Sequence, residues 1–405
     1  MNRPELLVGV ADFTCAIAGV KNGADALYFG VKGYNMRDLG TNFSTKELKK
    51  LMLYLHENKV KGYLALNTII FDDELKKVEK ILIAAKKARV DAIILSDLGV
   101  LALAKKHEMK VFLSTQASVS NSLALKEFAS LGVSRIILAR ELNLKQIKAV
   151  KKSAVKSKIE IECFVHGAMC ISVSGRCFLS HDLFKRSANR GECLQPCRRA
   201  FFLDGTAPDY EKKEVYLDGD TILSAKDLKT IDFLDAVIDT GVDSLKIEGR
   251  TKPSDYVATV TKYYREAIDA VINNKFTKER IVEWNKELEK VYNREFSDGF
   301  FYKTPTGNDL ARGQGSFQKQ KRVQVGFVVN YYKKVGVAEV RIINDLKIGD
   351  KLVFEGVTTF IEATLDSMQV HHKNVLSAKK GDLVGIKTKD RVRINDLVFA
   401  LKERK

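Results

Sequence analysis

The sequence contains little proline or tryptophan and no long apolar run. Only five of its 405 residues are proline and one is tryptophan, and no low-complexity segment interrupts it, so a disordered or fibrous protein is excluded. No apolar stretch approaches the roughly 20 residues that span a bilayer. The N-terminus has no basic start before its short apolar stretch and runs directly into Asp12, unlike a signal peptide. We therefore expect a soluble, cytoplasmic protein that does not bind membranes.

Basic residues outnumber acidic ones, 68 to 51, which gives a formal net charge of +17. The excess is uneven, because residues 319–405 hold 18 Lys and Arg against 10 Asp and Glu. A basic protein attracts polyanions, and nucleic acid is the commonest of these in cytoplasm. Lysine-rich surfaces also serve solvation alone. The charge favours RNA as a partner, mainly for the C-terminal part, and leaves simple solvation open.

Short apolar segments alternate with amphipathic helical patterns over the first 250 residues. Eight segments are candidate strands: 6–10, 23–30, 63–67, 90–97, 111–115, 132–140, 159–165 and 244–247. Helical patterns such as 45–58, 73–88 and 122–131 separate them. Apolar strands separated by helices indicate a buried parallel sheet. Eight of them predict a TIM-like (β/α)8 barrel, with a doubly wound open sheet as the alternative.

Two interruptions of this repeat set the predicted domain boundaries. The gap between the seventh and eighth strands predicts an insertion over about 167–243, and long insertions of this kind are usually functional. After the eighth strand, helical patterns continue over about 254–293. A glycine-containing basic segment, 313–322, is typical of a linker. The barrel domain is therefore predicted to cover 1–312.

The remaining residues, 323–405, change to short alternating strands at 323–331, 335–343, 351–354, 358–365 and 383–386. Turns such as Gly349-Asp350 and Gly381-Asp382 separate some of these strands. This pattern predicts a small, basic, antiparallel β-barrel. Its repeated Gly-Asp turns resemble those of domain II of translation elongation factors, which is a resemblance of fold alone.

Charged residues follow several predicted strands, at the barrel end where TIM-barrel enzymes place their reactive groups. Arg140 follows the sixth strand, and Glu248 and Arg250 follow the eighth. Within the seventh strand, alternation places Glu162 and His166 on one face. We expect this face to point into the barrel as an acid–base or binding element. The alternative is a structural ion pair across the barrel.

Four of the six cysteines fall within 28 residues: Cys170, Cys177, Cys193 and Cys197. Disulfides are not expected in a reducing cytoplasm, whereas four thiolates bind either zinc or an iron–sulfur cluster. Only the last pair has the close spacing of structural zinc sites, and the gaps also differ from ferredoxin spacings. The spacing indicates a metal site and slightly favours a cluster. We expect Cys163 and Cys15 to be buried core thiols.

Glycines and arginines surround this cysteine group: Gly167, Gly175, Gly191, Arg176, Arg190, Arg198 and Arg199. Glycine lets the backbone approach a bulky inorganic centre and donate N–H groups to it. Arginine either offsets the negative charge of a thiolate-bound cluster or binds an anionic substrate beside it.

The cysteine segments closely resemble the signature of peptidase family U32. The matching motifs are Glu162-Cys-Phe-Val-His-Gly-Ala-Met-Cys170, Gly175-Arg-Cys-Phe-Leu-Ser180, Asn189-Arg-Gly-Glu-Cys-Leu-Gln-Pro-Cys-Arg198 and Ser244-Leu-Lys-Ile-Glu-Gly-Arg250. The resemblance covers essentially the whole chain. It implies a 4Fe-4S cluster, with zinc as the alternative, held by Cys170, Cys177, Cys193 and Cys197. Some relatives take the fourth ligand from a later cysteine, but this chain has none after Cys197, so Cys197 is a ligand unless Cys163 or Cys15 reaches the cluster.

The family resemblance also implies a reaction. Better-understood members are oxygen-independent hydroxylases of tRNA wobble uridine, of a 23S rRNA cytidine or of ubiquinone precursors. The nucleic-acid branch is linked to prephenate as the source of the hydroxyl oxygen. The length of this chain, with one short C-terminal domain, is similar to the tRNA uridine branch. The implied partners are therefore tRNA and a small dicarboxylate.

Two other functions remain as alternatives. The first is the collagenase-like peptidase for which the family was named. The sequence has no His-Glu-x-x-His and no Gly-x-Ser-x-Gly motif, so two common hydrolase signatures are missing. The second is a non-catalytic RNA- or ribosome-binding protein, which does not explain the polar strand ends.

A dicarboxylate substrate needs a cationic clamp, and arginine holds carboxylates through paired hydrogen bonds. We expect four residues to line one cavity near the cluster: Arg140, His166, Arg176 and Arg250. Glu162 and Glu248 would orient the arginines or handle protons. Alternatively, Arg140 and Arg250 pair with Glu141 and Glu248 and only close the barrel.

Overall fold

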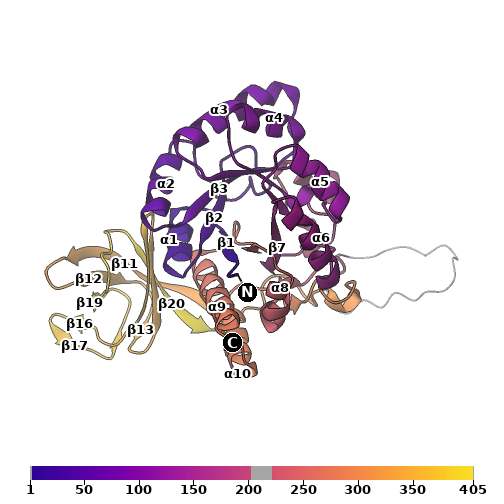
Figure 1. Cartoon of the computed structure of the whole chain (residues 1–405). Coiled ribbons are helices and arrows are strands. Elements are labelled where there is room, and N and C mark those ends of the chain that lie inside the picture. The colour runs from indigo at the N-terminus through magenta and orange to yellow at the C-terminus, as the bar shows by residue number, and fades with distance from the viewer. Residues whose placement is uncertain (1, 202–220, 405) are drawn as a thin grey trace.

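The structure, a computed structural model, describes residues 2–201 and 221–404. Eight parallel strands form its centre: β1 Glu5–Gly9, β2 Ala26–Gly30, β3 Lys61–Leu66, β4 Ala92–Leu95, β5 Val111–Leu113, β6 Arg135–Ile137, β7 Glu160–Gly167 and β9 Ser244–Ile247. Each strand pairs with the next, and β9 pairs with both β7 and β1. The sheet is therefore closed, as Figure 1 shows. This confirms the TIM-like barrel and all eight predicted strands.

Helices surround the barrel: α1 Phe13–Lys21, α2 Leu48–Glu57, α3 Leu75–Lys87, α4 Leu98–Lys106, α5 Ser122–Ser130, α6 Leu144–Lys156, α8 Leu234–Asp239 and α9 Ser254–Ile272. Side-chain caps fix where several begin. Asp12 accepts from the backbone N–H of Cys15 at the start of α1, and Asn143 forms a capping box at the start of α6, which satisfies otherwise unpaired N–H groups. The outward faces of the strands supply a continuous apolar core beneath these helices.

The insertion between β7 and β9 begins with α7 Leu179–Phe184 and contains β8 Asp227–Lys229. Residues 202–220 of this predicted insertion lie outside the described residues. Strand β8 pairs antiparallel with the end of β7 and parallel with β10 Phe296–Ser297. Helix α10, Lys278–Leu288, follows α9 and packs against it.

The C-terminal part is an antiparallel sheet, as predicted. Its order is β15-β14-β20-β11-β12-β19-β16-β17. The strands are β11 Gln320–Tyr332, β12 Val337–Ile342, β14 Lys351–Gly356, β15 Thr359–Thr364, β16 Gln369–Val370, β17 Lys373–Asn374, β19 Leu383–Lys387 and β20 Leu397–Glu403, with β13 Leu346–Lys347 pairing separately with β18 Ser377–Ala378. The sequence patterns missed β20, which lies between β14 and β11. Strand β11 begins at Gln320, so its first three residues belong to the predicted linker, 313–322.

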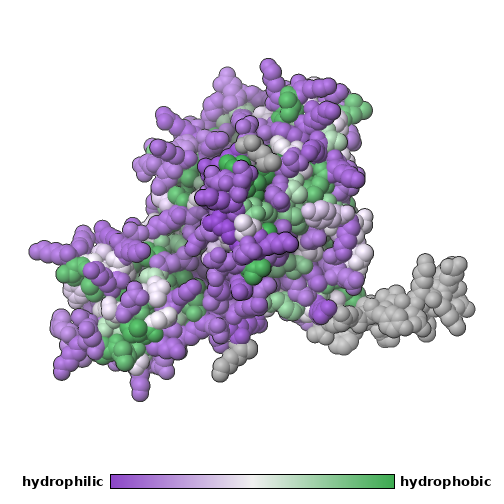
Figure 2. Space-filling model, turned by 60° about the horizontal axis from the view of Figure 1, so that its bottom comes forward, coloured by the Kyte–Doolittle hydropathy of each residue, from purple (hydrophilic) through white to green (hydrophobic). Residues whose placement is uncertain are grey.

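The C-terminal sheet lies beside α1 and α9 (Figure 1). The Thr14 hydroxyl donates to the carbonyl of Gly356 at 2.6 Å, and Lys21 pairs with Asp390 at 2.6 Å. Arg322 of β11 pairs with Asp255 of α9 at 3.1 Å. Figure 2 shows that one face of the molecule is mostly hydrophilic, with small separate hydrophobic areas. Among the described helices, none is both long and apolar enough to cross a bilayer.

Candidate active site at the barrel mouth

A cavity of about 190 Å³ lies at the carboxyl ends of the barrel strands, where parallel α/β barrels place their reactive groups. Its lining includes all four clustered cysteines: Cys170, Cys177, Cys193 and Cys197. Cys170 is exposed and the other three are half-buried. The insertion thus carries the whole cysteine group to one place on the barrel. Cys15 and Cys163 are buried elsewhere, in the apolar core.

The four thiols surround the cavity without closing on a single ion. Within residues 2–201 and 221–404, no three His, Cys, Asp or Glu side chains are arranged to hold one metal ion. Burial raises the pKa of the Cys193 thiol, although Arg37 opposes this shift. Burial likewise raises the pKa of Cys197, against the effect of Arg198. Four thiols of this kind fit a thiolate-ligated cluster in their chemistry.

Hydrogen bonds attach the cysteine loop to the barrel rim. Within the loop, the side chain of Asn189 accepts from the backbone N–H of Cys177 at 2.8 Å, and toward the rim the Asn189 carbonyl accepts from the backbone N–H of Ile69 at 3.4 Å. Arg190 donates to the carbonyl of Ile69 and to the Glu74 carboxylate, both at 2.8 Å. Arg190 therefore anchors the insertion at the start of α3 and is not free to compensate charge at the cysteines.

The glycines beside the cysteines allow close contact with other protein segments. Gly175 and Gly191 both have positive φ angles, of 75° and 90°. A Cβ atom would lie 2.6 Å from the Gln116 side chain at Gly175 and 2.1 Å from the Asn35 carbonyl oxygen at Gly191. Both positions thus require glycine for conformation and for space. The space that we expected to serve an inorganic centre is filled here by the barrel's own loops.

Charged side chains that follow β2 and β9 meet at the cavity. Glu248 pairs with Arg37 at 3.1 Å and accepts from the backbone N–H of Arg250 at 3.2 Å. Burial opposes the charged form of Glu248, but Arg37 and Arg250 outweigh it and lower the pKa of this carboxyl. The Arg250 guanidinium donates to the side chains of Asn35 and Asn42 at 2.7 and 2.6 Å. Burial lowers the pKa of Arg250 to about 10.

Several buried donors in this cavity have no partner among the described residues. They are the Nε and Nη2 atoms of Arg140, the Nε atom of Arg250 and the hydroxyl of Tyr28. Arg140 uses only Nη1, which donates to the carbonyl of Ala168 at 2.8 Å, and its guanidinium stacks 4.7 Å from the Phe164 ring centroid. Buried polar groups are normally hydrogen bonded. These donors are therefore available to an acceptor-rich ligand.

Glu162 points into the barrel as expected, but it lies below the cavity. Its side chain is fully buried and pairs with Lys246 at 2.9 Å and with Arg135 at 3.0 Å. Arg135 also pairs with Glu5 and Glu160 near the start of the strands. The structure thus places Glu162 in a structural ion network across the barrel, which was the alternative interpretation.

His166 lies on the opposite side of β7 from the one predicted. A β-bulge between Phe164 and His166 shifts the register against β9, so that His166 pairs with Ile247 on the helix-facing side. The ring packs among Tyr256, Tyr264 and Phe296, with centroids 5.3 to 6.0 Å away. Burial lowers its pKa to about 3. Strict alternation failed here because a bulge inserts one extra residue.

Arg176 is exposed and donates to the carbonyl of Gln116 at 3.4 Å, and among the described residues it is not part of the cavity lining. The structure therefore brings Arg140, Glu248 and Arg250 together with the four cysteines, and places Glu162, His166 and Arg176 elsewhere. In the alternative interpretation Arg250 pairs with Glu248; in the structure the Glu248 carboxylate pairs with the Arg37 side chain and accepts only the backbone N–H of Arg250.

Sequence reasoning missed three cationic residues of the lining: Arg37, Lys246 and Arg294. Lys246 alternates inward between Leu245 and Ile247 on β9, which is a signal that the sequence offered. Arg37 lies in the loop after β2, at the reactive end of the barrel. Arg294 donates to the side chain of Gln195 at 2.9 Å, and no local pattern indicates that contact.

Comparison with known proteins agrees with this architecture. The model of peptidase family U32 matches residues 11–310. The "Uncharacterized protease MJ0090" of Methanocaldococcus jannaschii is 45% identical, with 98% of each chain covered. A "Collagenase" of Porphyromonas gingivalis is 36% identical over 100% of this chain and 99% of that one. The "tRNA hydroxylation protein P1" of Bacillus subtilis is 34% identical over 96% and 92%. The chain belongs to peptidase family U32.

Proposed function

We propose that this protein hydroxylates a nucleotide of RNA in a reaction that does not use molecular oxygen. The most specific form of the proposal is hydroxylation at C5 of the wobble uridine of tRNA. The observation that carries the proposal is the mouth cavity, where four cysteines and the unpartnered donors of two arginines line one space. The tRNA hydroxylation protein P1 of Bacillus subtilis is similar to this chain over 96% of its length. The C-terminal sheet and its basic excess supply a surface for RNA.

The cysteines would hold a 4Fe-4S cluster, which supplies a redox centre when bound. The described residues then have three tasks: to bind the donor of the hydroxyl group, to orient it and to present the RNA base. Arg140 and Arg250 offer unpaired N–H groups to a carboxylate, and Glu248 fixes Arg37 beside them. Prephenate, a dicarboxylate, fits such a cationic pocket through paired charge-assisted hydrogen bonds.

The overall change balances as an oxygen transfer. The RNA carbon loses its hydrogen and gains a hydroxyl group, which is a two-electron oxidation. The donor gives up its hydroxyl oxygen, takes up the equivalent of the hydrogen that the RNA carbon loses and is thereby reduced by two electrons, so no molecular oxygen and no external oxidant are needed. When one cavity holds both the donor and the RNA base, the transfer becomes effectively unimolecular, which lowers its entropic cost.

An exposed aromatic residue beside the cysteines supports RNA as the substrate. Phe178 follows Cys177 directly, and 75% of its surface is exposed. Isolated exposed apolar residues are common, but single-stranded RNA is recognised largely by bases that stack on aromatic side chains. Phe178 thus offers a platform for an unstacked base near the cavity.

A peptidase is the second candidate, because relatives named as a protease and a collagenase match nearly the full chain. Among the described lining residues, however, no histidine stands beside a serine or cysteine, and such a base is what commonly activates a nucleophile. The arrangement of the cavity therefore favours hydroxylation.

The test is nucleoside mass spectrometry of tRNA and rRNA from a strain that lacks the gene, complemented with wild type or with Cys170→Ala. We expect 5-hydroxyuridine to disappear from tRNA and to return only with the wild type. Unchanged nucleosides in both RNA classes, together with gelatin cleavage by the purified protein, would support the peptidase instead.

A further inference from the structure

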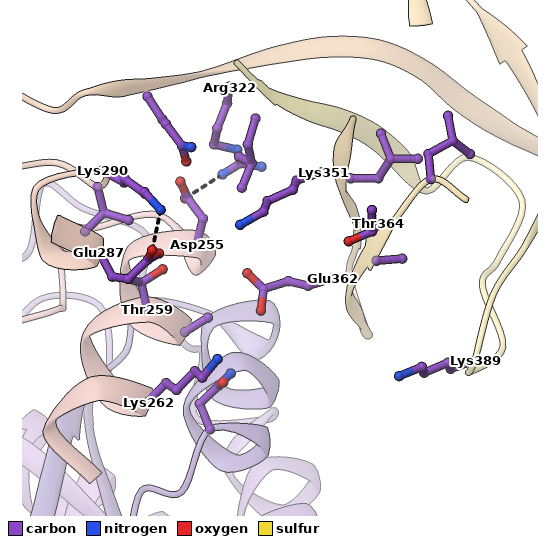
Figure 3. Close-up of a pocket in the computed structure, with 18 of the residues that line it drawn as sticks. Asp255, Thr259, Lys262, Glu287, Lys290, Arg322, Lys351, Glu362, Thr364 and Lys389 are labelled. Atoms are coloured by element: carbon purple, nitrogen blue, oxygen red, sulfur yellow. Dashed lines mark hydrogen bonds and ion pairs between the residues drawn. The ribbon is translucent and has the colours of Figure 1, made fainter. Parts of the chain in front are cut away.

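A second and larger cavity, of about 640 Å³, lies between the barrel and the C-terminal sheet. Figure 3 shows its walls, which come from helix α9 on one side and from β14, β15 and the following loops on the other. Asp255, Thr259 and Lys262 line it from α9. They are four and three residues apart, so they share one face of the helix. The cleft is therefore built jointly by both parts of the chain.

Some charges in this cleft are already neutralised by ion pairs. Arg322 pairs with Asp255 at 3.1 Å, and Lys290 pairs with Glu287. The dashed lines in Figure 3 mark both contacts. These pairs join or support the walls and contribute little net charge to the cleft.

Five lysines of the lining form no ion pair within the described part of the chain: Lys262, Lys321, Lys351, Lys387 and Lys389. Two carboxylates of the lining, Glu362 and Asp366, are likewise unpaired there. All five lysines are exposed, so they remain accessible to a ligand. A concave surface with this excess of one sign concentrates counter-ions more strongly than a flat surface does.

The residues that line the cleft begin close in the sequence to residues that line the mouth cavity. Arg250 lines the mouth, and α9 begins four residues later at Ser254, with Asp255 already lining the cleft. The Tyr256 hydroxyl, in the first turn of α9, donates to the carbonyl of Glu248 at 3.2 Å, so the start of α9 lies against the strand end that carries Glu248 and Arg250. Lysine contacts to phosphates give affinity and position a nucleic acid without reading its sequence.

We infer that this inter-domain cleft binds the phosphodiester backbone of the substrate RNA and thereby positions a nucleotide at the barrel mouth. The inference rests on the proposed function, because it assumes that RNA is the substrate. It assigns the RNA contact to a groove that both domains build, with Lys262 on the barrel and Lys351 and Lys389 on the sheet domain. Figure 3 shows these three side chains directed toward the cleft, with Glu362 near Lys262 and Lys351.

The experiment compares two triple variants that remove equal charge. The cleft variant is Lys262→Gln with Lys351→Gln and Lys389→Gln. The control is Lys76→Gln with Lys80→Gln and Lys126→Gln, three exposed lysines on α3 and α5. Binding of bulk tRNA is measured from 50 to 200 mM salt. We expect the cleft variant to lose more than about tenfold in affinity at 0.1 M salt and about 2 to 3 units of salt slope. The control should change less than about twofold.

A third variant should change the affinity for tRNA in the opposite direction. Glu362→Gln removes an acidic group from the cleft, so tRNA should bind more tightly than to the wild type. An equal loss of tRNA affinity in both triple variants, or weaker tRNA binding by Glu362→Gln, would overturn the role of the cleft. The proposed function would still stand in that case, as long as the wild-type protein binds tRNA. A wild-type protein that binds no tRNA and supports no RNA hydroxylation in cells overturns the proposed function itself.

Discussion

Replacing Arg140 by lysine tests whether the mouth cavity is a carboxylate clamp. Arg140 has one guanidinium nitrogen bound to the carbonyl of Ala168, while Nε and Nη2 are buried without a partner among the described residues. Lysine keeps the positive charge but loses the planar fork that grips a carboxylate through two parallel bonds. The change therefore removes at least one charge-assisted hydrogen bond to the ligand.

Such a bond contributes about 1.5 to 3 kcal/mol. At about 1.4 kcal/mol per tenfold change, the affinity for prephenate should fall about 10- to 150-fold. The folded protein itself should lose little stability, because a lysine ammonium can still donate to the Ala168 carbonyl and the two N–H groups that are lost have no partner among the described residues. A merely structural Arg140 predicts the reverse result, with a lower stability and an unchanged affinity.

The assay is calorimetric binding of prephenate to the anaerobically purified protein, with urea unfolding and iron content measured on the same samples. Arg176→Lys is the matched control. It makes the same substitution at an exposed arginine that is not among the described residues lining the cavity. Full prephenate affinity in Arg140→Lys, or an equal loss in Arg176→Lys, would refute the clamp.

Two further predictions concern the cysteines and the barrel interior. Single alanine substitutions of Cys170, Cys177, Cys193 or Cys197 should each lower the iron bound per chain, whereas Cys163→Ala, in the apolar core, should retain it. Glu162→Gln should lower the free energy of unfolding by about 3 to 5 kcal/mol in urea titration, because it leaves Arg135 and Lys246 buried with a lost partner. Glu108→Gln, which breaks an exposed ion pair with Lys86, should cost less than about 1 kcal/mol.

The barrel was predictable because its signal is repeated and local. Strands buried on both faces are almost wholly apolar, and eight of them recur between helical patterns. The C-terminal sheet was predictable for most of its strands, but β20 pairs with β11 and β14, which are distant in sequence. Its seven residues follow the turn residues Asn395 and Asp396, a local signal that the pattern analysis missed.

The site was predictable where a residue follows a strand directly, as Arg140 and Arg250 do. Arg37 was missed because its loop has neither helical nor strand periodicity, and its position depends on Glu248, 211 residues away. The cysteine group was found from its density in the sequence, although its approach to the barrel mouth depends on anchors such as the Arg190–Glu74 pair. Tertiary contacts of this kind leave no trace in local spacing.

The bulge in β7 gives His166 a measurable consequence for stability. Its pKa is about 3 in the fold, where burial disfavours the imidazolium, against about 6.5 in the unfolded chain. Between these values only the unfolded state binds the proton, so the stability falls as the pH drops below 6.5, by about 1.4 kcal/mol per unit. His166→Phe keeps a ring among Tyr256, Tyr264 and Phe296 and removes this proton. From pH 8 to pH 5 the variant should therefore lose about 2 kcal/mol less than the wild type in urea unfolding. If the free energies of unfolding of the wild type and the variant changed equally with pH, His166 would not be buried as a neutral ring.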